Sequence, residues 1–339
     1  MPNKLSDGSP PTISIVTPAF NESSNLLALW KRLCVSMESA GAEWEWIVVD
    51  DHSTDTTFET ISALSAANRH VHGYRFSRNF GSHLALTCGL ENAHGRCAVV
   101  MAGDLQDAPE LLPELIDKWR NGAQVVWAVR REREGETATT VRTANLFYFI
   151  VRHLAGLKNM SPTGADFFLI DRVVIDALNQ FPERNVSLMA LITWMGFRQD
   201  QVSYTKQARS HGRSGWSLEK KLKLAIDSIT SFTYLPIRAM TYLGICVAIC
   251  GFLYAILVIT NTLRHHLVQG WASLMVVVLV LGGAQMLMLG VLGEYLWRAF
   301  DESRRRPRYI IERLCGSRVL TGAEQTRPES GLRAADGSE

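Results

Sequence analysis

Acidic and amide side chains follow two hydrophobic runs of this chain, and their spacing suits chemistry on a phosphate-bearing ligand. Asp50 and Asp51 end the first run, and their carboxylates can accept hydrogen bonds from a ribose or from a base N–H. Asp104 and Gln106 follow the second run, two residues apart in an extended turn, so their oxygens point the same way. Such hard oxygen ligands suit Mg²⁺ or Mn²⁺, which share their coordination with phosphate oxygens.

Each of these motifs also has a plain structural interpretation. An Asp-x-Ser-x-Asp sequence after a strand, here residues 51–55, is also an ordinary loop with a helix cap. Residues 104–107 equally suit an acidic turn before a helix that starts at Pro109, where a missing N–H is not needed. Neither motif alone decides between binding and structure.

Strands that alternate with helices must position these side chains. Short apolar runs predict the strands, and apolar residues at helical spacing predict the helices between them. The predicted strands are 13–17, 46–49, 71–76, 97–101, 124–129 and 166–170, and the predicted helices include 82–93, 109–120 and 137–157. This alternation predicts an α/β domain with a mostly parallel, doubly wound sheet. In such sheets ligands bind at the carboxyl ends of the strands, where Asp50, Asp51 and Asp104 fall.

Two long segments without charged side chains predict a membrane anchor in the C-terminal part. Residues 239–263 and 271–293 each reach the roughly 20 apolar residues that a helix needs to cross a bilayer. Lys and Arg residues gather before the first segment and after the second, so the positive-inside rule places both termini in the cytoplasm. Residues 217–235 combine an apolar face with a lysine-rich one, which predicts an interfacial helix. A core helix of the soluble domain is the alternative for these residues.

Bulk composition limits the classes of function. The 339 residues include 35 Lys and Arg against 33 Asp and Glu, a formal net charge of +2, which argues against a nucleic-acid-binding protein. The six cysteines have neither CxxC pairs nor zinc-ligand spacing, so we expect them to be reduced. Residues 1–11 are polar and have no apolar run, which predicts no secretory signal.

Taken together, the motifs resemble those of the family-2 glycosyltransferases. Four of them occur in order: 18–22 (PAFNE), 49–55 (VDDHSTD), 77–81 (SRNFG) and 104–110 (DLQDAPE). In the C-terminal part, three more are similar to the two-helix membrane region of the bacterial undecaprenyl-phosphate members: 282–285 (GGAQ), 293–296 (GEYL) and 304–307 (RRRP). The resemblance covers roughly residues 13–311, and it is to the polyprenyl-phosphate branch that includes dolichol-phosphate mannose synthase.

This resemblance implies a GT-A fold and an inverting, metal-dependent transfer of a sugar. The donor would be a nucleotide-sugar, and the acceptor would be polyprenyl (undecaprenyl) phosphate at the cytoplasmic face of the membrane. The residues implied to hold the base and ribose, with the last two nearby, are Pro18, Phe20, Glu22, Asp51, Arg78 and Asn79. Asp104 and Gln106 would bind the Mg²⁺ or Mn²⁺ that bridges the diphosphate.

Two further residues match positions near the acceptor. Asp166, in 163–167 (TGADF), matches an Asp near the sugar and the acceptor. Arg209, in 209–216 (RSHGRSGW), matches the Arg of the loop that meets the acceptor phosphate. A phosphate monoester is already an anion near neutral pH. A strong general base is therefore not required, and two roles stay open for Asp166: it acts as a base, or it orients the donor or the acceptor.

Three positions depart from the pattern of this family. Ala102 stands in place of the first carboxylate of the usual Asp-x-Asp motif, which predicts a simpler metal ligation. Gly215 replaces the usual Lys of the acceptor loop, where Arg213 is a candidate for the lost charge, and Phe168 replaces an Arg. These changes keep an alternative open, in which the chain is a catalytically silent membrane scaffold of an envelope glycan complex.

The observations divide the chain into five parts. They are a flexible N-terminus (1–11), a GT-A domain (12–216), an interfacial helix (217–236), two transmembrane helices (237–298) and a cytoplasmic segment with a disordered tail (299–339). The expected location is the bacterial inner membrane, in a pathway that modifies cell-envelope glycans or lipids. Glycines in the spans permit packing between subunits, so a homo-oligomer is compatible with the sequence. The sequence identifies neither the sugar nor the nucleotide.

Overall fold

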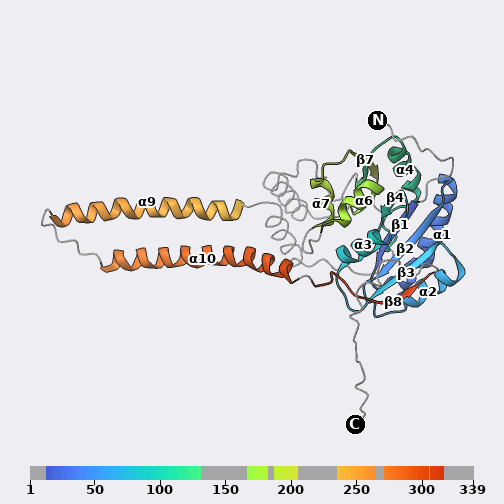
Figure 1. The fold of residues 1–339 in the computed structure, drawn as a ribbon, viewed down its shortest axis with the longest axis horizontal. Helices are drawn as coiled ribbons and strands as arrows, with labels where there is room; N and C mark the ends of the chain where they lie inside the picture. Colours follow the sequence, from blue (N-terminus) through green and yellow to red (C-terminus); the bar gives the residue numbers. More distant parts are fainter. Residues whose placement is uncertain are drawn as a thin grey trace, which may run out of the picture.

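The computed structural model describes residues 13–130, 166–181, 187–204, 235–263, 271–304 and 306–316. These residues form an eight-stranded sheet with helices on both faces, and two long helices extend from one side of that domain (Figure 1). The strands are β1 (Ile13–Ala19), β2 (Trp44–Asp50), β3 (Val71–Phe76), β4 (Cys97–Val100), β5 (Val125–Arg130), β6 (Phe167–Asp171), β7 (Gln199–Tyr204) and β8 (Ile311–Cys315).

The sheet is mixed but mostly parallel, which confirms the predicted fold class. Its strand order is β7-β5-β6-β4-β1-β2-β3-β8. β1 pairs in parallel with β2 and β4, β2 pairs with β3, and β5 pairs with β7. β6 runs antiparallel between β4 and β5, and β8 runs antiparallel along β3. The carboxyl ends of the parallel strands therefore share one edge with the amino ends of β6 and β8.

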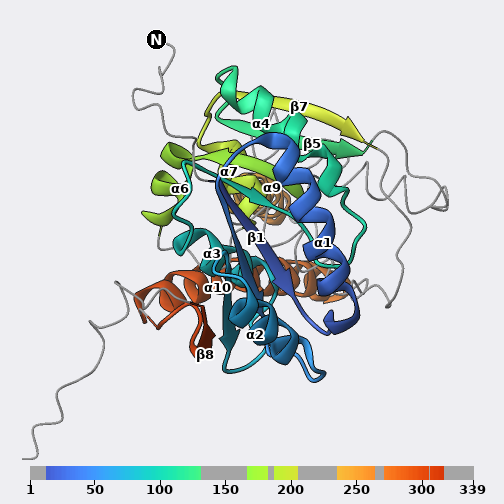
Figure 2. The same ribbon diagram turned by 90° about the vertical axis from the view of Figure 1, so that its right-hand side faces the viewer.

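Helices lie on both faces of the sheet (Figure 2), and a layer of buried hydrophobic side chains holds them to each face. The helices of the first layer are α1 (Ser23–Ala40), α2 (Thr57–Ala67) and α4 (Leu112–Arg120), which follows the 3₁₀ turn η1 (Pro109–Leu111). The helices of the second layer are α3 (Ser82–Glu91), α6 (Arg172–Asn179) and α7 (Leu188–Trp194). Because both faces of the central strands are covered, those strands are continuous runs of apolar residues rather than alternating ones.

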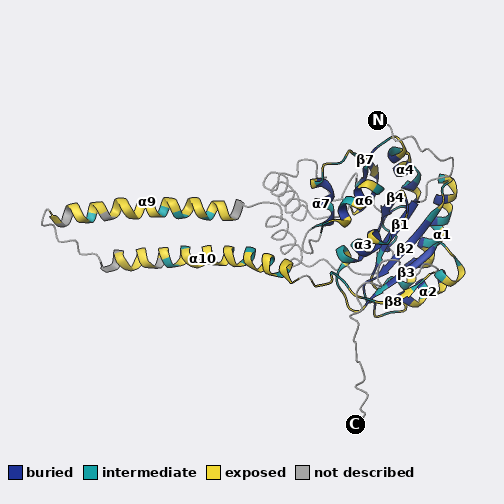
Figure 3. Cartoon of the chain, in the orientation of Figure 1, coloured by how far each residue is buried: buried dark blue, intermediate teal, exposed yellow. Residues whose placement is uncertain are grey.

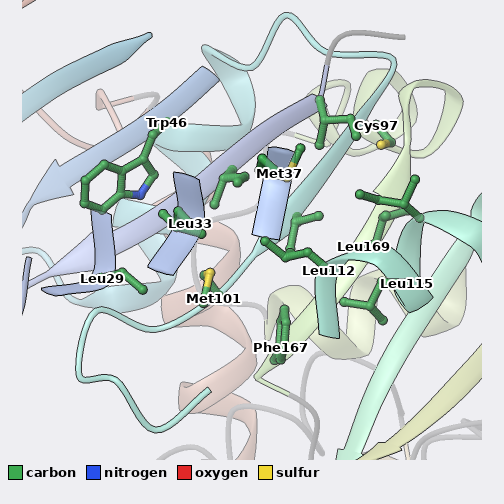
Figure 4. Close-up of a cluster of buried hydrophobic side chains, with 14 of the residues drawn as sticks. Leu29, Leu33, Met37, Trp46, Cys97, Met101, Leu112, Leu115, Phe167 and Leu169 are labelled. Atoms are coloured by element: carbon green, nitrogen blue, oxygen red, sulfur yellow. The ribbon is translucent and has the colours of Figure 1, made fainter. Parts of the chain in front are cut away.

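The first layer shows how helix periodicity becomes packing. Leu29, Leu33 and Met37 lie on one face of α1, and all three are buried near Trp46 (Figure 4). Fully burying a side chain of this size contributes roughly 1.5–3 kcal/mol relative to leaving it exposed. This packing holds β1 and β2 against α1, and it thereby fixes the points at which the loops after both strands begin.

Two helices of the described part are long and apolar enough to cross a membrane: α9 (Leu235–Leu263) and α10 (Trp271–Ser303). Their apolar side chains are exposed along most of their length (Figure 3), whereas a core helix of a soluble protein would be mostly buried. α10 extends to Ser303, beyond the uncharged segment 271–293. Its 33 residues span about 50 Å, longer than the roughly 30 Å hydrocarbon layer, so one end must extend beyond that layer.

After α10 the chain returns to the sheet as β8. β8 pairs with β3, and the Ser77 N–H donates to the Ile310 carbonyl oxygen at 3.0 Å. Tyr309 stacks on Phe76, with ring centroids 5.0 Å apart. We assigned residues 299–339 from the sequence to a segment separate from the α/β domain, but Ile311–Cys315 is an edge strand of that domain.

Several predicted segments lie outside the described residues. They are the N-terminus 1–11, the helix 137–157, nearly all of the interfacial helix 217–236, the loop 264–270 and the tail after Gly316. Arg209 and the rest of the acceptor loop belong to the same group.

Candidate functional site

The loops after β1 and β4 lie against each other at the carboxyl edge of the sheet. A Cβ atom placed on Gly103 would lie 3.5 Å from the carbonyl oxygen of Pro18 and 3.6 Å from Cγ of Glu22. Asp104 follows directly and is buried. The structure therefore brings two residues predicted to hold the nucleotide, Pro18 and Glu22, beside the predicted metal turn.

The turn at Asp104 has an unusual backbone. Leu105 has a φ of +61°, a left-handed conformation that is strained for a bulky residue. Its side chain packs against the first hydrophobic layer, which offsets that strain. The Gln106 N–H donates to Oδ1 of Asp104 at 3.2 Å, so the turn is closed on itself. Asp104 and Gln106 are thereby held in one tight turn.

A second acid, Asp107, stabilises this turn through two hydrogen bonds. Asp107 is fully buried and accepts a hydrogen bond from the Ala102 N–H at 3.0 Å. Its other oxygen accepts one from the Tyr204 hydroxyl at 2.8 Å, which ties the turn to the last residue of β7. Asp107 is therefore a structural residue of the site, a role that we did not assign from the sequence.

The residues of this turn fit a divalent cation that substrate phosphates help to coordinate. In the described part of the chain no group of three or more His, Cys, Asp or Glu side chains could hold a metal ion without further ligands. One carboxylate and one amide, from Asp104 and Gln106, are hard oxygen donors. Mg²⁺ typically takes one or two protein carboxylates and completes its shell with phosphate oxygens and water. The donor set suits that kind of site.

Asp50 and Asp51 are adjacent in the sequence but have different surroundings. Asp50 is fully buried, and its Oδ2 lies 3.1 Å from Nη1 of Arg75, while its Oδ1 accepts from the Ser53 N–H at 2.9 Å. The same guanidinium donates to the Ser53 carbonyl oxygen at 3.1 Å. Asp50 therefore stabilises the loop after β2 rather than facing a ligand.

Asp51 connects the loop after β2 to the start of α3. Its two carboxylate oxygens accept hydrogen bonds from the N–H of Phe80 at 2.6 Å and from the N–H of Gly81 at 2.8 Å. Gly81 has a φ of +98°, which a residue with a side chain rarely adopts. Burial raises the pKa of the Asp51 carboxyl above its ordinary value, and these two N–H groups oppose the rise.

The loop after β1 is cross-linked to the loop after β2 and presents an aromatic ring. The Asn21 N–H donates to the Ser53 hydroxyl at 2.9 Å, and Oδ1 of Asn21 accepts from the Thr54 N–H at 2.9 Å. The Glu22 N–H donates to the Thr57 hydroxyl, also at 2.9 Å. Phe20 remains 46% exposed beside these bonds, an arrangement that leaves its ring open to stacking by a planar group.

Arg78 and Asn79 follow β3 at the same edge and are both exposed. The guanidinium of Arg78 lies 4.1 Å from the centre of the Phe80 ring, a cation–π distance. Because Phe80 also donates its N–H to Asp51, the predicted residues of β2 and β3 meet in this loop.

Asp166, the residue before β6, lies at the same edge. β6 is antiparallel to β4, and Val100 pairs with Phe168, so Asp166 lies beside the loop that leads from β4 to the metal turn. It is exposed. Arg209, the remaining predicted site residue, lies outside the described residues.

One histidine at this edge was not singled out from the sequence. In the described part of the chain, Nδ1 of His83, in the first turn of α3, is buried and has no hydrogen-bond partner. Burial lowers the pKa of His83, while the Asp166 carboxylate acts in the opposite direction. A lone histidine at the start of a helix has no distinctive sequence pattern, so only the structure could reveal this surrounding.

We expect replacement of Asp51 with Asn to weaken both folding and nucleotide binding. The amide NH₂ would face the N–H of Phe80 or Gly81, and an unsatisfied buried donor costs about 1–3 kcal/mol. The melting temperature and the nucleotide dissociation constant measure the two effects. A variant with wild-type values for both would contradict the assigned role.

The wild-type protein adds a pH test of the same residue. Because the folded-state pKa of Asp51 is raised, the folded chain binds a proton at this carboxyl more readily than the unfolded chain does. The contribution of Asp51 to the free energy of unfolding therefore rises as the pH falls from that pKa towards the ordinary Asp value. Nucleotide binding to the carboxylate should instead weaken over this range, starting at a higher pH than an ordinary Asp would give. The Asn variant should lack this pH dependence.

The carboxyl edge thus combines oxygen donors for a cation, an exposed aromatic ring and an exposed guanidinium. These groups can bind a diphosphate through a cation and stack a planar base. Such a surface suits a nucleoside diphosphate and the group that it carries.

Known proteins share both this domain and the C-terminal helices. Residues 14–178 match the family Glycosyl transferase family 2. An uncharacterized glycosyltransferase of Synechocystis sp. is 39% identical over 309 residues, which are 91% of this chain and 97% of that protein. The bactoprenol glucosyl transferase of Shigella phage SfV is 38% identical over 301 residues, 88% of this chain and 98% of that protein.

The α/β domain is also similar to a solved structure. The glucosyl-3-phosphoglycerate synthase of Mycobacterium tuberculosis, crystallised with Mn²⁺, uridine diphosphate and glucosyl-3-phosphoglycerate, is 18% identical with a TM-score of 0.47. The similarity covers 65% of this chain and 77% of that one. With relatives at nearly 40% identity that are matched over almost their whole length, this chain belongs to glycosyl transferase family 2 and is a glycosyltransferase.

Proposed function

We propose that this glycosyltransferase moves a sugar from a nucleotide-sugar to polyprenyl phosphate, undecaprenyl phosphate in bacteria. The observation that carries the proposal is the presence, in one chain, of an acidic carboxyl edge and two exposed apolar helices. The edge suits a water-soluble donor, and the helices place the enzyme where a lipid acceptor resides. A relative that aligns with 88% of this chain is named bactoprenol glucosyl transferase, which supports the choice of acceptor.

In this proposal the donor binds along the carboxyl edge. Phe20 and Pro18 contact the base, and Glu22 and Asp51 hold the base and ribose, with Arg78 and Asn79 nearby. Asp104 and Gln106 would hold Mg²⁺ or Mn²⁺ against the diphosphate. The cation would supply neutralisation of the negative charge that grows on the leaving diphosphate.

The acceptor phosphate needs positioning rather than strong activation. A phosphate oxygen attacks the anomeric carbon as the bond from that carbon to the diphosphate oxygen breaks, so the nucleoside diphosphate leaves and the configuration inverts. Since a phosphate monoester is already anionic near neutral pH, no strong base is required. Arg209 and Arg213 bind the acceptor phosphate, and Asp166 orients the sugar or the acceptor.

The proposed location is the bacterial inner membrane, with the GT-A domain and both termini in the cytoplasm. Arg238 lies at the start of the first candidate span, Arg298 lies near the end of the second, and Arg304 and Arg306 follow it, as the positive-inside rule requires of cytoplasmic ends. Glycines of α10, such as Gly282 and Gly290, permit close packing between the helices of a homo-oligomer.

Transfer to the lipid can be tested directly with the purified full chain. Radiolabelled UDP-glucose, GDP-mannose and other common donors are incubated with undecaprenyl phosphate and Mn²⁺. We expect one donor to yield a labelled glycolipid that EDTA abolishes, and NMR of the product should show an inverted anomeric centre. Undecaprenol without phosphate is the control acceptor and should remain unlabelled. The absence of a metal-dependent glycolipid with every donor would refute the proposal.

A further inference from the structure

The strand that follows the membrane helices reaches the loop proposed to bind the nucleotide. In the pairing of β8 with β3, Arg313 lies opposite Arg75 and Ile311 lies opposite Phe76, with an irregularity between these two pairs. Glu312 lies between these two pairs and has no opposite residue on β3. A bulge of this kind turns a side chain away from its regular direction and often lies next to a functional site.

Glu312 turns towards the loop after β2. Its Oε2 atom lies 3.5 Å from Nε of Arg75 and 3.8 Å from Nδ1 of His52. Arg75 in turn binds the buried Asp50 carboxylate and the Ser53 carbonyl oxygen. One carboxylate from the C-terminal strand thus faces two basic side chains that shape the loop carrying Asp51.

His52 lies in the same loop and has a strained backbone conformation. It has a φ of +61°, a left-handed conformation that costs energy for a residue with a side chain. Its Nδ1 lies 3.0 Å from the Phe76 carbonyl oxygen, and because a carbonyl can only accept, that nitrogen must carry the proton of this bond. The Glu312 carboxylate lies 3.8 Å from the same nitrogen.

Other contacts of the C-terminal segment hold β8 in place without touching this loop. Arg313 lies over the Phe58 ring at 4.7 Å and pairs with Glu59 at 3.6 Å. Arg308 pairs with Glu91 of α3 at 3.1 Å. The attachment of β8 and the contact of Glu312 with the loop can therefore be separated by mutation.

We propose that β8 completes the donor site and that Glu312 is a positioning residue, which acts through His52 and Arg75 on the loop that carries Asp51. The proposal rests on the proposed function for the identity of the ligand, a nucleoside diphosphate. The sheet of this domain is then complete only when β8, which follows α9 and α10 in the chain, pairs with β3.

The test compares Glu312→Gln with Glu59→Gln in the full-length protein. Both changes remove one half-exposed carboxylate that forms an ion pair with a basic side chain. Glu312 pairs with His52 and Arg75, whereas Glu59 pairs with Arg313. The first readout is the dissociation constant of UDP and of GDP with Mn²⁺ by calorimetry. We expect Glu312→Gln to weaken binding about three- to five-fold, the upper part of the range for an exposed ion pair, and Glu59→Gln to leave it unchanged. The KM for the lipid acceptor should change in neither variant.

Hydrogen exchange supplies a readout that does not need the nucleotide. Amides of residues 52–56 should exchange faster in Glu312→Gln than in the wild type, and Glu312→Asp should restore part of the protection. If the wild type binds no nucleotide, the proposed function fails while the exchange data still test Glu312. Equal exchange in Glu312→Gln and the wild type, or equal effects in both glutamine variants, would overturn the inference.

A pair of truncations tests the strand as a whole. A chain that ends after Gly316 should bind nucleotide as the full chain does. A chain that ends after Ser303 lacks β8 and should lose binding by more than tenfold if it folds. Retention of wild-type binding by the shorter chain would also overturn the inference.

Discussion

Replacing Asp104 with Asn is expected to lower kcat/KM by more than about 100-fold, because even groups that only support a metal ligand contribute 10- to 100-fold. The carboxylate is buried in the tight turn with Gln106, beside Pro18 and Glu22. An Asn side chain keeps the shape of this turn but removes the negative charge that a divalent cation needs. Steady-state kinetics at several Mn²⁺ concentrations measure the loss, which added metal should restore in part.

Asp117→Asn is the matched control for this experiment. Asp117 is exposed on α4 and pairs with Arg120 one turn along the helix, away from the carboxyl edge. Its replacement should change neither kcat/KM nor the requirement for Mn²⁺. If Asp104→Asn kept wild-type activity, Asp104 would not be the metal ligand. A silent scaffold would instead keep its cellular role in the Asp104→Asn variant, so complementation in cells separates that alternative from the enzyme.

The Asp107→Asn variant should lose about 2 kcal/mol or more of folding stability, with a matching fall in its affinity for Mn²⁺ and nucleotide. Asp107 accepts hydrogen bonds from the Ala102 N–H and the Tyr204 hydroxyl in a fully buried place. An amide has a single acceptor oxygen, so one of these donors would face an NH₂ group. Thermal unfolding in detergent and calorimetric titration measure the two effects.

Tyr204→Phe provides the graded comparison. It removes one of the two bonds to Asp107 but leaves the Ala102 N–H paired, so we expect a loss of about 1 kcal/mol and little change in Mn²⁺ affinity. The Phe variant keeps the ring that packs on Phe167, so it tests the hydroxyl alone. A larger loss in Tyr204→Phe than in Asp107→Asn would contradict the assignment of the Asp107 carboxylate as the group that holds the turn.

The acids of the carboxyl edge show how far the sequence could assign roles. Asp50 and Asp51 form one predicted pair, yet Asp50 pairs with Arg75 below the surface while Asp51 receives two N–H groups from the start of α3. Successive residues of an extended chain point to opposite sides, so neighbours in the sequence can meet different partners. In the same way, Asp104 is in the proposed metal turn, whereas Asp107 stabilises that turn through hydrogen bonds.

The edge strand β8 was missed for a physical reason. Its sequence, IERLC, has charged residues at its centre and is exposed or half-buried along its length. Such a strand has neither a continuous apolar run nor a regular alternation, so its hydrophobic pattern does not distinguish it from a loop. Its place is decided by pairing with β3, a strand more than 200 positions earlier.

The sequence by itself determined the α/β alternation, the carboxyl-edge location of the acidic loops and the two apolar helices. All of these depend on local periods and on runs of apolar residues, which neighbours along the chain define. Only the tertiary structure decided which acids are structural and that β6 and β8 run antiparallel to the other strands. It also decided that Glu312 of β8 contacts the loop after β2. Those features depend on contacts such as that of Asp107 with Tyr204, 97 positions apart, and no local pattern records them.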